Sequence, residues 1–379
     1  MNDDAAGLRE RVQAVVPLIA ARSAEAEQQR KPADDVIEAL KRTGVFRSFV
    51  PKRYGGYEID LELFMDIGVD VSEACPSTGW ITTFYMEHNW LLGMFDEQLQ
   101  HEIFSAQPYI LAPGTVNPSG EATRRDDHYE LTGRWQFGTG IVHADWTLLS
   151  GRIVGEDSAL PRMFLVPVDD VEVKDTWHVD GMAATGSRDI VARSVQVPFD
   201  RVSSVAFDAS EPPTDYLKRL PVRPFLALTA AIPAIGCARR AVHLFRARMT
   251  DRVMFGSTKR QAETSAGQAR LGNVTVRASI TESTMRTVAR EMTAHARGDI
   301  DLTTIDHMRL RVTIAHVVRQ CRDIVRDVLE ASGAGAHFLD NELQRIHRDV
   351  HMIAAHTVFD VDVAALELGR ALLRADASS

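Results

Sequence analysis

The chain has few cysteines, no excess of basic residues and no long uninterrupted apolar run. Its three cysteines, Cys75, Cys237 and Cys321, are far apart and odd in number, which fits neither a disulfide framework nor a CxxC metal site and indicates buried thiols. Lys and Arg number 43 against 52 Asp and Glu, giving a formal net charge of −9. Because nucleic-acid binding needs a clustered basic surface, this acidic balance argues against nucleic acid as the main partner.

Absent segments and motifs narrow the class of protein further. No stretch approaches the ~18 uninterrupted apolar residues of a membrane helix, and the N-terminal sequence MNDDAAGLRERVQ lacks the basic and apolar regions of a signal peptide. We therefore expect a cytoplasmic protein that does not bind a membrane. The motifs GxGxxG after a strand, GxxxxGK[ST], HExxH and GxSxG are also missing, so a dinucleotide-binding βαβ unit is not supported.

The spacing of apolar residues changes period along the chain. Helical spacing predicts an N-terminal helical domain over 1–108. Its expected helices cover 5–30, 32–44, 60–74 and 77–105. A period of two then predicts a β domain over 109–212. Its expected strands cover 128–137, 146–154, 162–168, 171–176 and 194–198.

Helical spacing returns after a proline-containing linker at 211–216 and predicts a C-terminal four-helix bundle over 213–379. Its long blocks cover 222–254, 263–297, 302–332 and 342–375. The expected fold class is therefore α+β and mostly α. In the first expected strand, Tyr129, Leu131, Trp135 and Phe137 share one parity, which is typical of a half-buried strand.

This order of domains resembles the acyl-CoA dehydrogenase superfamily, and three local strings agree with it. His128–Gly140, HYELTGRWQFGTG, is similar to the aromatic-rich strand that passes the flavin. Arg252–Gly256, RVMFG, which is expected in the first bundle helix, is similar to the Arg-x-x-Phe-Gly motif on the flavin phosphate side. Ser332–Ala336, followed by Leu343–Asp349, is similar to the Gly-rich turn and Arg-Asp motif before the last helix. The resemblance implies a β-barrel-like middle domain and a homotetramer whose flavin sites are completed by neighbouring subunits.

One departure from the dehydrogenases points to a branch of the superfamily. A dehydrogenase needs a carboxylate to abstract the substrate α-proton, usually shortly after the Arg-Asp motif, but His351–Asp360 reads HMIAAHTVFD and contains no Glu. The chain instead resembles the flavin-dependent monooxygenases of this fold. These include the oxygenase components of two-component phenol hydroxylases, such as hydroxyphenylacetate and hydroxylated-steroid-ring hydroxylases, and dibenzothiophene monooxygenases.

The resemblance to this branch implies the site residues. Trp80 and His88 match a Trp and His eight residues apart in the helical domain, and Thr139 matches a hydroxyl residue, more often Ser, that bonds flavin N5. His356 is the best match to a His in the last helix that faces the flavin's oxygen-bearing edge, and His351 is the second. The residues expected to bind the flavin are Trp80, Trp135, Phe137, Thr139, Arg252, Phe255 and Gly333.

The implied chemistry explains why histidines are the expected catalytic groups. Reduced flavin and dioxygen form a C4a-hydroperoxyflavin, which has to be protonated and kept from water in a dry pocket. With an ordinary pKa of ~6.5, histidine can give or take a proton near neutrality. We expect His88 to bind or deprotonate a phenolic hydroxyl and His356 to stabilise or protonate the peroxide, although the two roles could be exchanged.

The resemblance also implies the partners. They are reduced FMN or FAD, with FMN slightly preferred, a separate NAD(P)H:flavin reductase and a small aromatic substrate. The alternatives are an N- or S-oxygenase of the same fold, an acyl-CoA dehydrogenase with a displaced base, and a non-catalytic scaffold.

Simpler explanations exist for individual site residues. A lone His beside aromatic residues is more often a hydrogen-bonded core residue, Trp135 and Phe137 could be plain β core, and Arg252 could be a solvated charge. The Gly-rich turn around Gly333 could only end a helix. His347 and His351 lie four residues apart, but on a helix His356 falls far around from His351, so no metal site is expected.

Overall fold

The computed structural model describes residues 5–156, 161–203 and 215–376. The chain forms two compact units. Unit 1 comprises residues 1–64, 81–179 and 183–220, and unit 2 comprises 65–80, 180–182 and 221–379. The predicted boundary at 212 and most of the predicted linker at 211–216 lie outside the described residues.

The N-terminal part of the chain is helical, as predicted. Its helices are α1 (Leu8–Gln13), α2 (Val16–Gln29), α3 (Asp34–Thr43), α4 (Leu61–Ala74), α5 (Pro76–Leu92) and α6 (Glu97–Ala106). The expected helix at 77–105 is two helices, because the Asp96 side chain accepts a hydrogen bond from the Gln98 amide and caps a new helix there. Likewise, Pro17 in the first turn of α2 separates it from α1.

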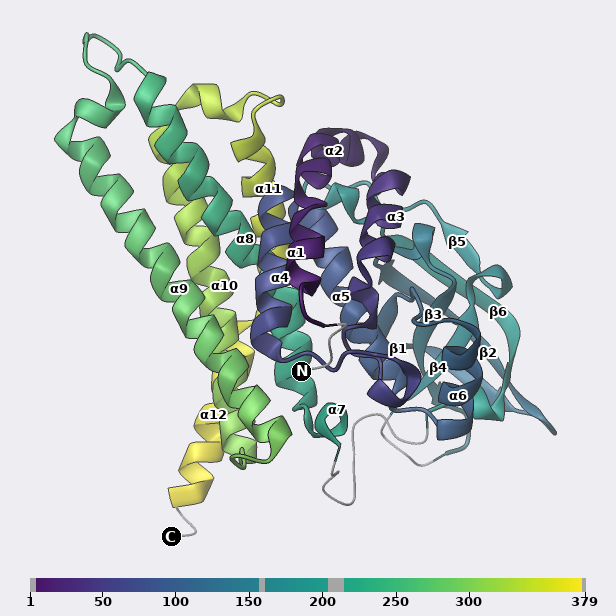
Figure 1. Ribbon diagram of the computed structural model, residues 1–379. Coiled ribbons are helices and arrows are strands. Elements are labelled where there is room, and N and C mark those ends of the chain that lie inside the picture. Colours follow the sequence, from purple (N-terminus) through teal and green to yellow (C-terminus); the bar gives the residue numbers. More distant parts are fainter. Residues whose placement is uncertain (1–4, 157–160, 204–214, 377–379) are drawn as a thin grey trace. The chain divides into compact units, whose positions relative to one another are not determined.

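A six-stranded sheet forms most of the rest of unit 1 (Figure 1). Its strands are β1 (Gly114–Arg124), β2 (His128–Gly138), β3 (Trp146–Ile153), β4 (Arg162–Pro167), β5 (Glu172–Lys174) and β6 (Arg188–Pro198). Their order is β4-β3-β1-β2-β6-β5, and only the pair β1–β3 is parallel. The short helix α7 (Tyr216–Arg219) follows the sheet in sequence.

Two features of the sheet differ from the sequence prediction. Strand β1 was not predicted, because Pro118 and Gly120 interrupt its pattern; a register shift against β3 between Thr115 and Gly120 accommodates them. The parity prediction is wrong for Phe137, whose side chain is 60% exposed. The register of β2 against β6 shifts between Trp135 and Gly138, and Phe137 adopts a φ of 65° there.

The core of the sheet is built around Trp135. Its indole is buried, and Nε1 donates to the Ser150 carbonyl at 2.7 Å. Gly120 lies directly against the indole, so that a Cβ at this position would be 2.2 Å from Trp135 Cζ2. The side chains that share this core include Tyr129, Leu131, Leu149, Phe164, Ile190 and Val197.

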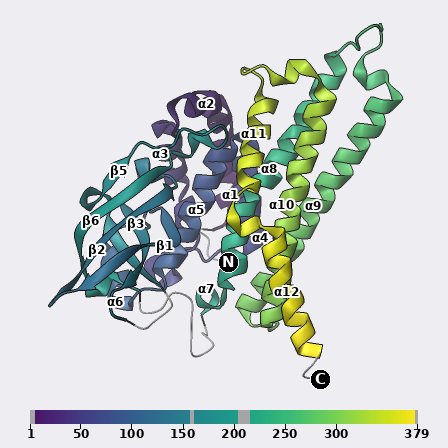
Figure 2. The ribbon, with the colours of Figure 1, turned by 180° about the vertical axis from the view of Figure 1, so that it is seen from behind.

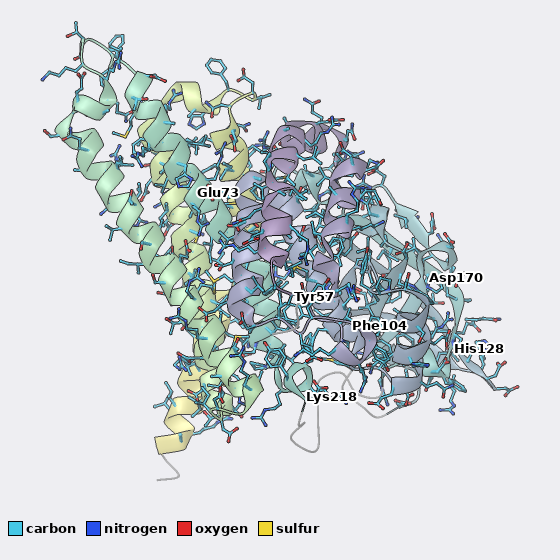
Figure 3. The ribbon with its side chains drawn as sticks, in the orientation of Figure 1. Tyr57, Glu73, Phe104, His128, Asp170 and Lys218 are labelled. Carbon is cyan, nitrogen blue, oxygen red and sulfur yellow. The ribbon has the colours of Figure 1, made fainter. Side chains whose placement is uncertain are left out.

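Unit 2 contains the predicted C-terminal helical bundle. Its long helices are α8 (Val222–Asp251), α9 (Ser265–Arg297), α10 (Thr304–Ser332), α11 (Glu342–Ala354) and α12 (Val361–Asp376). Helix α10 packs against each of the other four, and Figure 2 shows it with α11 and α12 from behind. Ion pairs attach α4 to this bundle: Glu73 (Figure 3) interacts with Arg239 and His243 of α8.

Two predicted helix boundaries in the bundle are wrong. The block at 342–375 is interrupted by a 3-10 turn at Thr357–Phe359, where the His356 side chain accepts a hydrogen bond from the Val358 amide. His356 therefore lies between α11 and α12 and not within the last helix. Helix α8 ends at Asp251, so that Arg252–Gly256 follows the first bundle helix and does not lie in it.

Helix α8 is long and apolar enough, by length and composition, to cross a membrane. However, 83% of its apolar window is buried, as is typical of the core helix of a bundle. The three cysteines are free and buried, which confirms that prediction. The helical, β and helical order of the fold is also confirmed.

The packing of Gly120 against Trp135 can be tested with matched Gly→Ala substitutions. Gly120→Ala should lower the free energy of unfolding by ~1–3 kcal/mol, because the new methyl group overpacks the buried indole. Gly272→Ala is the control, since no atom lies within 4 Å of its Cβ position on α9 and alanine favours a helix. Urea unfolding of both variants measures the difference, and equal midpoints for Gly120→Ala and wild type would contradict the packing.

Candidate active site

Helix α5 places His88 in the interior of unit 1. The imidazole is 2% exposed, and its Nδ1 lies 2.6 Å from the Ala112 carbonyl. Because a carbonyl oxygen only accepts, Nδ1 carries the proton and Nε2 is left with a lone pair. Burial lowers the pKa of His88 to about 4, so the ring is neutral at neutral pH.

Glu87, the residue before His88, is the one acidic residue of α5, which contains no Lys or Arg. Its side chain is fully buried, and among the described residues neither carboxyl oxygen has a hydrogen-bond partner. Oε2 lies 3.5 Å from Nε2 of His88, at the outer limit of a hydrogen bond. Burial raises the pKa of Glu87 well above its ordinary value, which favours the protonated, neutral form of this carboxyl.

Hydrogen bonds from α5 position the chain around it. The Tyr85 hydroxyl donates to the Gly140 carbonyl, and the Gly140 amide donates to the Thr185 carbonyl at 3.1 Å. The Asn89 side chain donates to the Ile110 carbonyl at 3.0 Å and accepts from the Ile110 amide at 2.9 Å. These bonds hold the segment leading to Ala112 and the turn after β2 against one helix.

The end of β2 presents an exposed aromatic ring beside hydroxyl groups. The Phe137 ring stands edge-to-face with Trp177, with centroids 5.9 Å apart and an interplanar angle of 90°. Thr139 lies 3.5 Å from the Ser187 hydroxyl, which lies 2.7 Å from that of Thr185. An apolar flat surface with hydroxyl donors at its edge fits a flavin ring, which is flat, with hydrogen-bonding atoms along its edge.

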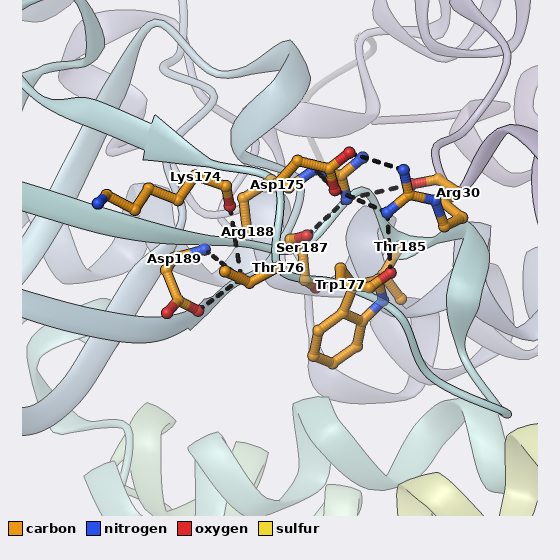
Figure 4. A network of polar contacts seen from close by, with 9 residues as sticks. All are labelled: Arg30, Lys174, Asp175, Thr176, Trp177, Thr185, Ser187, Arg188 and Asp189. Atoms are coloured by element: carbon orange, nitrogen blue, oxygen red, sulfur yellow. Dashed lines mark hydrogen bonds and ion pairs between the residues drawn. The ribbon is translucent and has the colours of Figure 1, made fainter.

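A polar network fixes the segment that carries Trp177 (Figure 4). Arg30 pairs with Asp175 at 2.6 Å and donates to the Trp177 carbonyl at 3.2 Å, and Arg188 pairs with Asp175 at 3.0 Å. The hydrogen bond from Arg30 lowers the pKa of Asp175, which keeps this carboxylate ionised. The network fixes the position of this segment and adds little to the free energy of unfolding, because exposed ion pairs are weak.

Unit 2 brings together Trp80 and His356, two of the predicted site residues. Their ring centroids are 5.9 Å apart, and the His356 ring also lies 6.1 Å from that of Phe359. His356 is an exposed residue, and desolvation by its neighbours lowers the pKa of its imidazole. His351 contacts a different partner: its Nδ1 donates to the His347 carbonyl at 2.8 Å, and the two rings are 4.1 Å apart.

Arg252 and Gly333 also lie together in unit 2. Arg252 donates to the Ala331 carbonyl at 2.7 Å, and its guanidinium lies against Gly333, where a Cβ would be 2.3 Å from Nη2. Gly333 has a φ of 69°, a conformation that favours glycine. Phe255, by contrast, is fully exposed. The described residues contain no group of three His, Cys, Asp or Glu that could hold a metal ion.

Comparisons with known proteins identify the family. The model of the acyl-CoA dehydrogenase C-terminal domain matches residues 228–361. A pigment production hydroxylase of Rhodococcus sp. (strain ATCC 21145) is 33% identical over 370 residues, covering 96% of this chain and 95% of the relative. The chain belongs to the flavin-dependent monooxygenases of the acyl-CoA dehydrogenase fold. It is an oxygenase component of the two-component type, and several of its relatives are named as an oxygenase component or oxygenase subunit.

Other members of this monooxygenase family match over almost the whole chain. The oxygenase component of p-hydroxyphenylacetate 3-hydroxylase from Acinetobacter baumannii is 29% identical over 96% of this chain and 88% of its own. The structure of XiaF from Streptomyces sp., in complex with FADH2 and glycerol, has a TM-score of 0.91 at 28% identity and covers 97% of this chain and 95% of its own. The expected family, fold class and enzyme class are thereby confirmed, and the alternatives are not favoured.

The roles of individual residues in this monooxygenase stay predictions. Sequence reasoning missed Glu87, Trp177, Thr185 and Ser187. The signal for Glu87 was its position as a lone acid in an otherwise uncharged helix. The other three carry no sequence signal, because the folding of the 174–188 segment places them beside Phe137 and Thr139.

The pKa of His88 predicts how the stability of this monooxygenase depends on pH. Between pH 6.5 and about 4 the unfolded imidazole binds a proton that the folded one does not, so stability falls as pH falls through this window. The loss for one such group is up to ~1.4 kcal/mol per pH unit. His88→Gln keeps a donor for the Ala112 carbonyl and does not titrate, so its stability should fall less steeply. Urea unfolding across this pH range measures the difference, and parallel curves would contradict the assignment.

Proposed function

We propose that this oxygenase component hydroxylates a small phenolic substrate, using dioxygen and reduced flavin from a separate NAD(P)H:flavin reductase. The observation that carries the proposal is the neutral, buried imidazole of His88, whose proton is held at Nδ1 and whose Nε2 is an acceptor. Relatives named for p-hydroxyphenylacetate and, in Rhizobium sp., for resorcinol support a phenolic substrate.

Each unit contains residues that we propose bind flavin. In unit 1, the ring of Phe137 beside Trp177 would contact its flat face, and Thr139 and Ser187 would hydrogen bond its polar edge. In unit 2, Trp80 would contact the ring, and Arg252, Phe255 and Gly333 would bind its phosphate side. When bound, reduced flavin supplies the electrons that activate dioxygen. Trp135 would act indirectly, because its buried indole anchors β2 two residues before Phe137.

His88 would act on the substrate hydroxyl. With a pKa of about 4 the imidazole is a weak base, so it accepts a hydrogen bond readily but gains a proton only when negative charge forms nearby. A phenol that loses its proton supplies that charge as the oxyanion. His356, with Trp80 and Phe359 around it, would take the second role of holding a proton at the oxygen-bearing side, with His351 as the alternative.

The choice of flavin and the assembly are also part of the proposal. We propose that the site accepts either reduced flavin; XiaF was solved with FADH2, and the resorcinol hydroxylase is named as FADH2-dependent, which adds weight to FAD.

We propose a homotetramer, because Phe255, Phe338 and Leu339 expose apolar side chains that another copy would cover. A cytoplasmic location would give the reductase access to NAD(P)H.

The source of electrons can be tested with the purified chain. NADH alone should give no turnover, because reduction is delegated to another protein, whereas chemically reduced FMN or FAD with oxygen should hydroxylate 4-hydroxyphenylacetate or resorcinol. Product analysis with labelled dioxygen should place one labelled oxygen atom in the product. Turnover with NADH alone, or an oxygen atom taken from water, would contradict the proposal.

His88→Gln should lower the hydroxylation rate by about 10²-fold or more, since proton transfer by a positioned side chain contributes about that much. Flavin consumption should continue, with hydrogen peroxide released in place of product. His101→Gln, which changes an exposed histidine on α6, is the control. Equal rates of product formation for His88→Gln and wild type would exclude His88 from the reaction.

A further inference from the structure

Glu87 is a buried acid for which the proposed function has no role. It is fully buried, and within the described residues both of its carboxyl oxygens lack a hydrogen-bond partner. A buried polar group without a partner costs free energy, so its presence calls for an explanation in terms of what it contacts during function. Nε2 of His88 lies 3.5 Å from its Oε2.

The imidazole cannot turn away from this carboxyl. Nδ1 is held by the Ala112 carbonyl, and the Phe84 ring packs edge-on against His88 with centroids 5.4 Å apart. On the third side Gly114 approaches so closely that a Cβ would be 2.9 Å from Nε2. The lone pair of Nε2 is therefore kept beside the Glu87 carboxyl, which as a neutral acid has a proton to donate.

We propose that Glu87 and His88 form a proton relay, in which Oε2 of the protonated Glu87 carboxyl donates to Nε2 of His88 and Oε1 receives the hydroxyl group of the aromatic substrate. This inference rests on the proposed function and deepens it: His88 still takes the proton of the substrate hydroxyl, and Glu87 passes that proton to it. Oε1 is a buried acceptor with no partner among the described residues, as a hydroxyl-binding atom requires.

The relay is balanced in protons and charge. The substrate O–H bond breaks as a bond forms between that proton and Oε1, while the Oε2–H bond breaks and Nε2 gains the proton. Glu87 is a neutral acid before and after the step, and the products are a substrate oxyanion and an imidazolium. The interior thus never holds an isolated carboxylate, which would be costly to bury.

Tyr85 and Asp145, two other titratable groups in unit 1, interact with groups other than Glu87. On α5, Tyr85 donates to the Gly140 carbonyl, and its pKa is raised by burial and by Asp145. Burial raises the pKa of Asp145, in the segment before β3, and the charge of Lys41 opposes this shift. The pKa of Glu87 is raised by burial, with no contribution from a charged group among the described residues.

Infrared difference spectroscopy of the flavin-free protein tests the first half of the relay. Wild type minus Glu87→Gln should show the C=O stretch of a protonated carboxylic acid at neutral pH. Glu97→Gln, which changes an exposed acid on α6, is the matched control and should show only carboxylate bands. A carboxylate signal for Glu87 would overturn the relay whether or not the protein hydroxylates phenols.

Substrate binding and turnover test the second half. Glu87→Gln keeps an acceptor and a donor but cannot pass a proton, so it should bind 4-hydroxyphenylacetate within a few-fold of wild type while hydroxylation falls about 10²-fold or more. Glu87→Met removes both atoms, and the preference for 4-hydroxyphenylacetate over phenylacetate should fall about tenfold. A fully active Glu87→Gln beside an inactive His88→Gln would overturn the relay and leave the proposed function intact. If wild type hydroxylates no phenol, the proposed function fails, and the infrared band still decides where the proton resides.

Discussion

The hydrogen bond from the Tyr85 hydroxyl to the Gly140 carbonyl is the contact on which the site in unit 1 depends. Tyr85 is buried, so its hydroxyl has to find a partner inside the protein. Gly140 can provide it because it has a φ of 74° and no side chain; a Cβ would lie 2.5 Å from the tyrosine oxygen. The same turn continues from Thr139 and is bonded to Thr185, so a single helix fixes both the imidazole of His88 and the end of β2.

Burial on α5 favours the neutral forms of two titratable groups, Glu87 and His88. An ionised carboxylate without a partner is strongly disfavoured there, and the His88 imidazole is a weak base that gains a proton only when an oxyanion forms nearby. A site that has to exclude water benefits from this arrangement, because proton donors and acceptors are available without ions that draw water in.

Local strain accompanies the exposed ring of Phe137. A non-glycine residue in the left-handed region costs on the order of 1–3 kcal/mol, and exposing the ring also forfeits the burial that its parity would have provided. The rigid core around Trp135 holds the strand in this conformation. In unit 2, a break between two helices also positions a predicted site residue. The turn after α11 places His356 beside Trp80 and Phe359.

The sequence by itself determined the helical, β and helical order, the buried cysteines and the family, because apolar periodicity and short motifs are local properties of the chain. It also pointed to His88, Thr139 and Trp80, which lie in continuous motifs. Tertiary structure alone decided that β1 pairs with β2 and β3 despite Pro118, and that a register shift turns Phe137 outward. It likewise decided that a 3-10 turn capped by His356 interrupts the last helical block and that Glu87 is enclosed beside Nε2 of His88. Strand pairing and burial depend on residues distant in the chain, whose contacts no local pattern specifies, and the protonation of a buried acid follows from that burial.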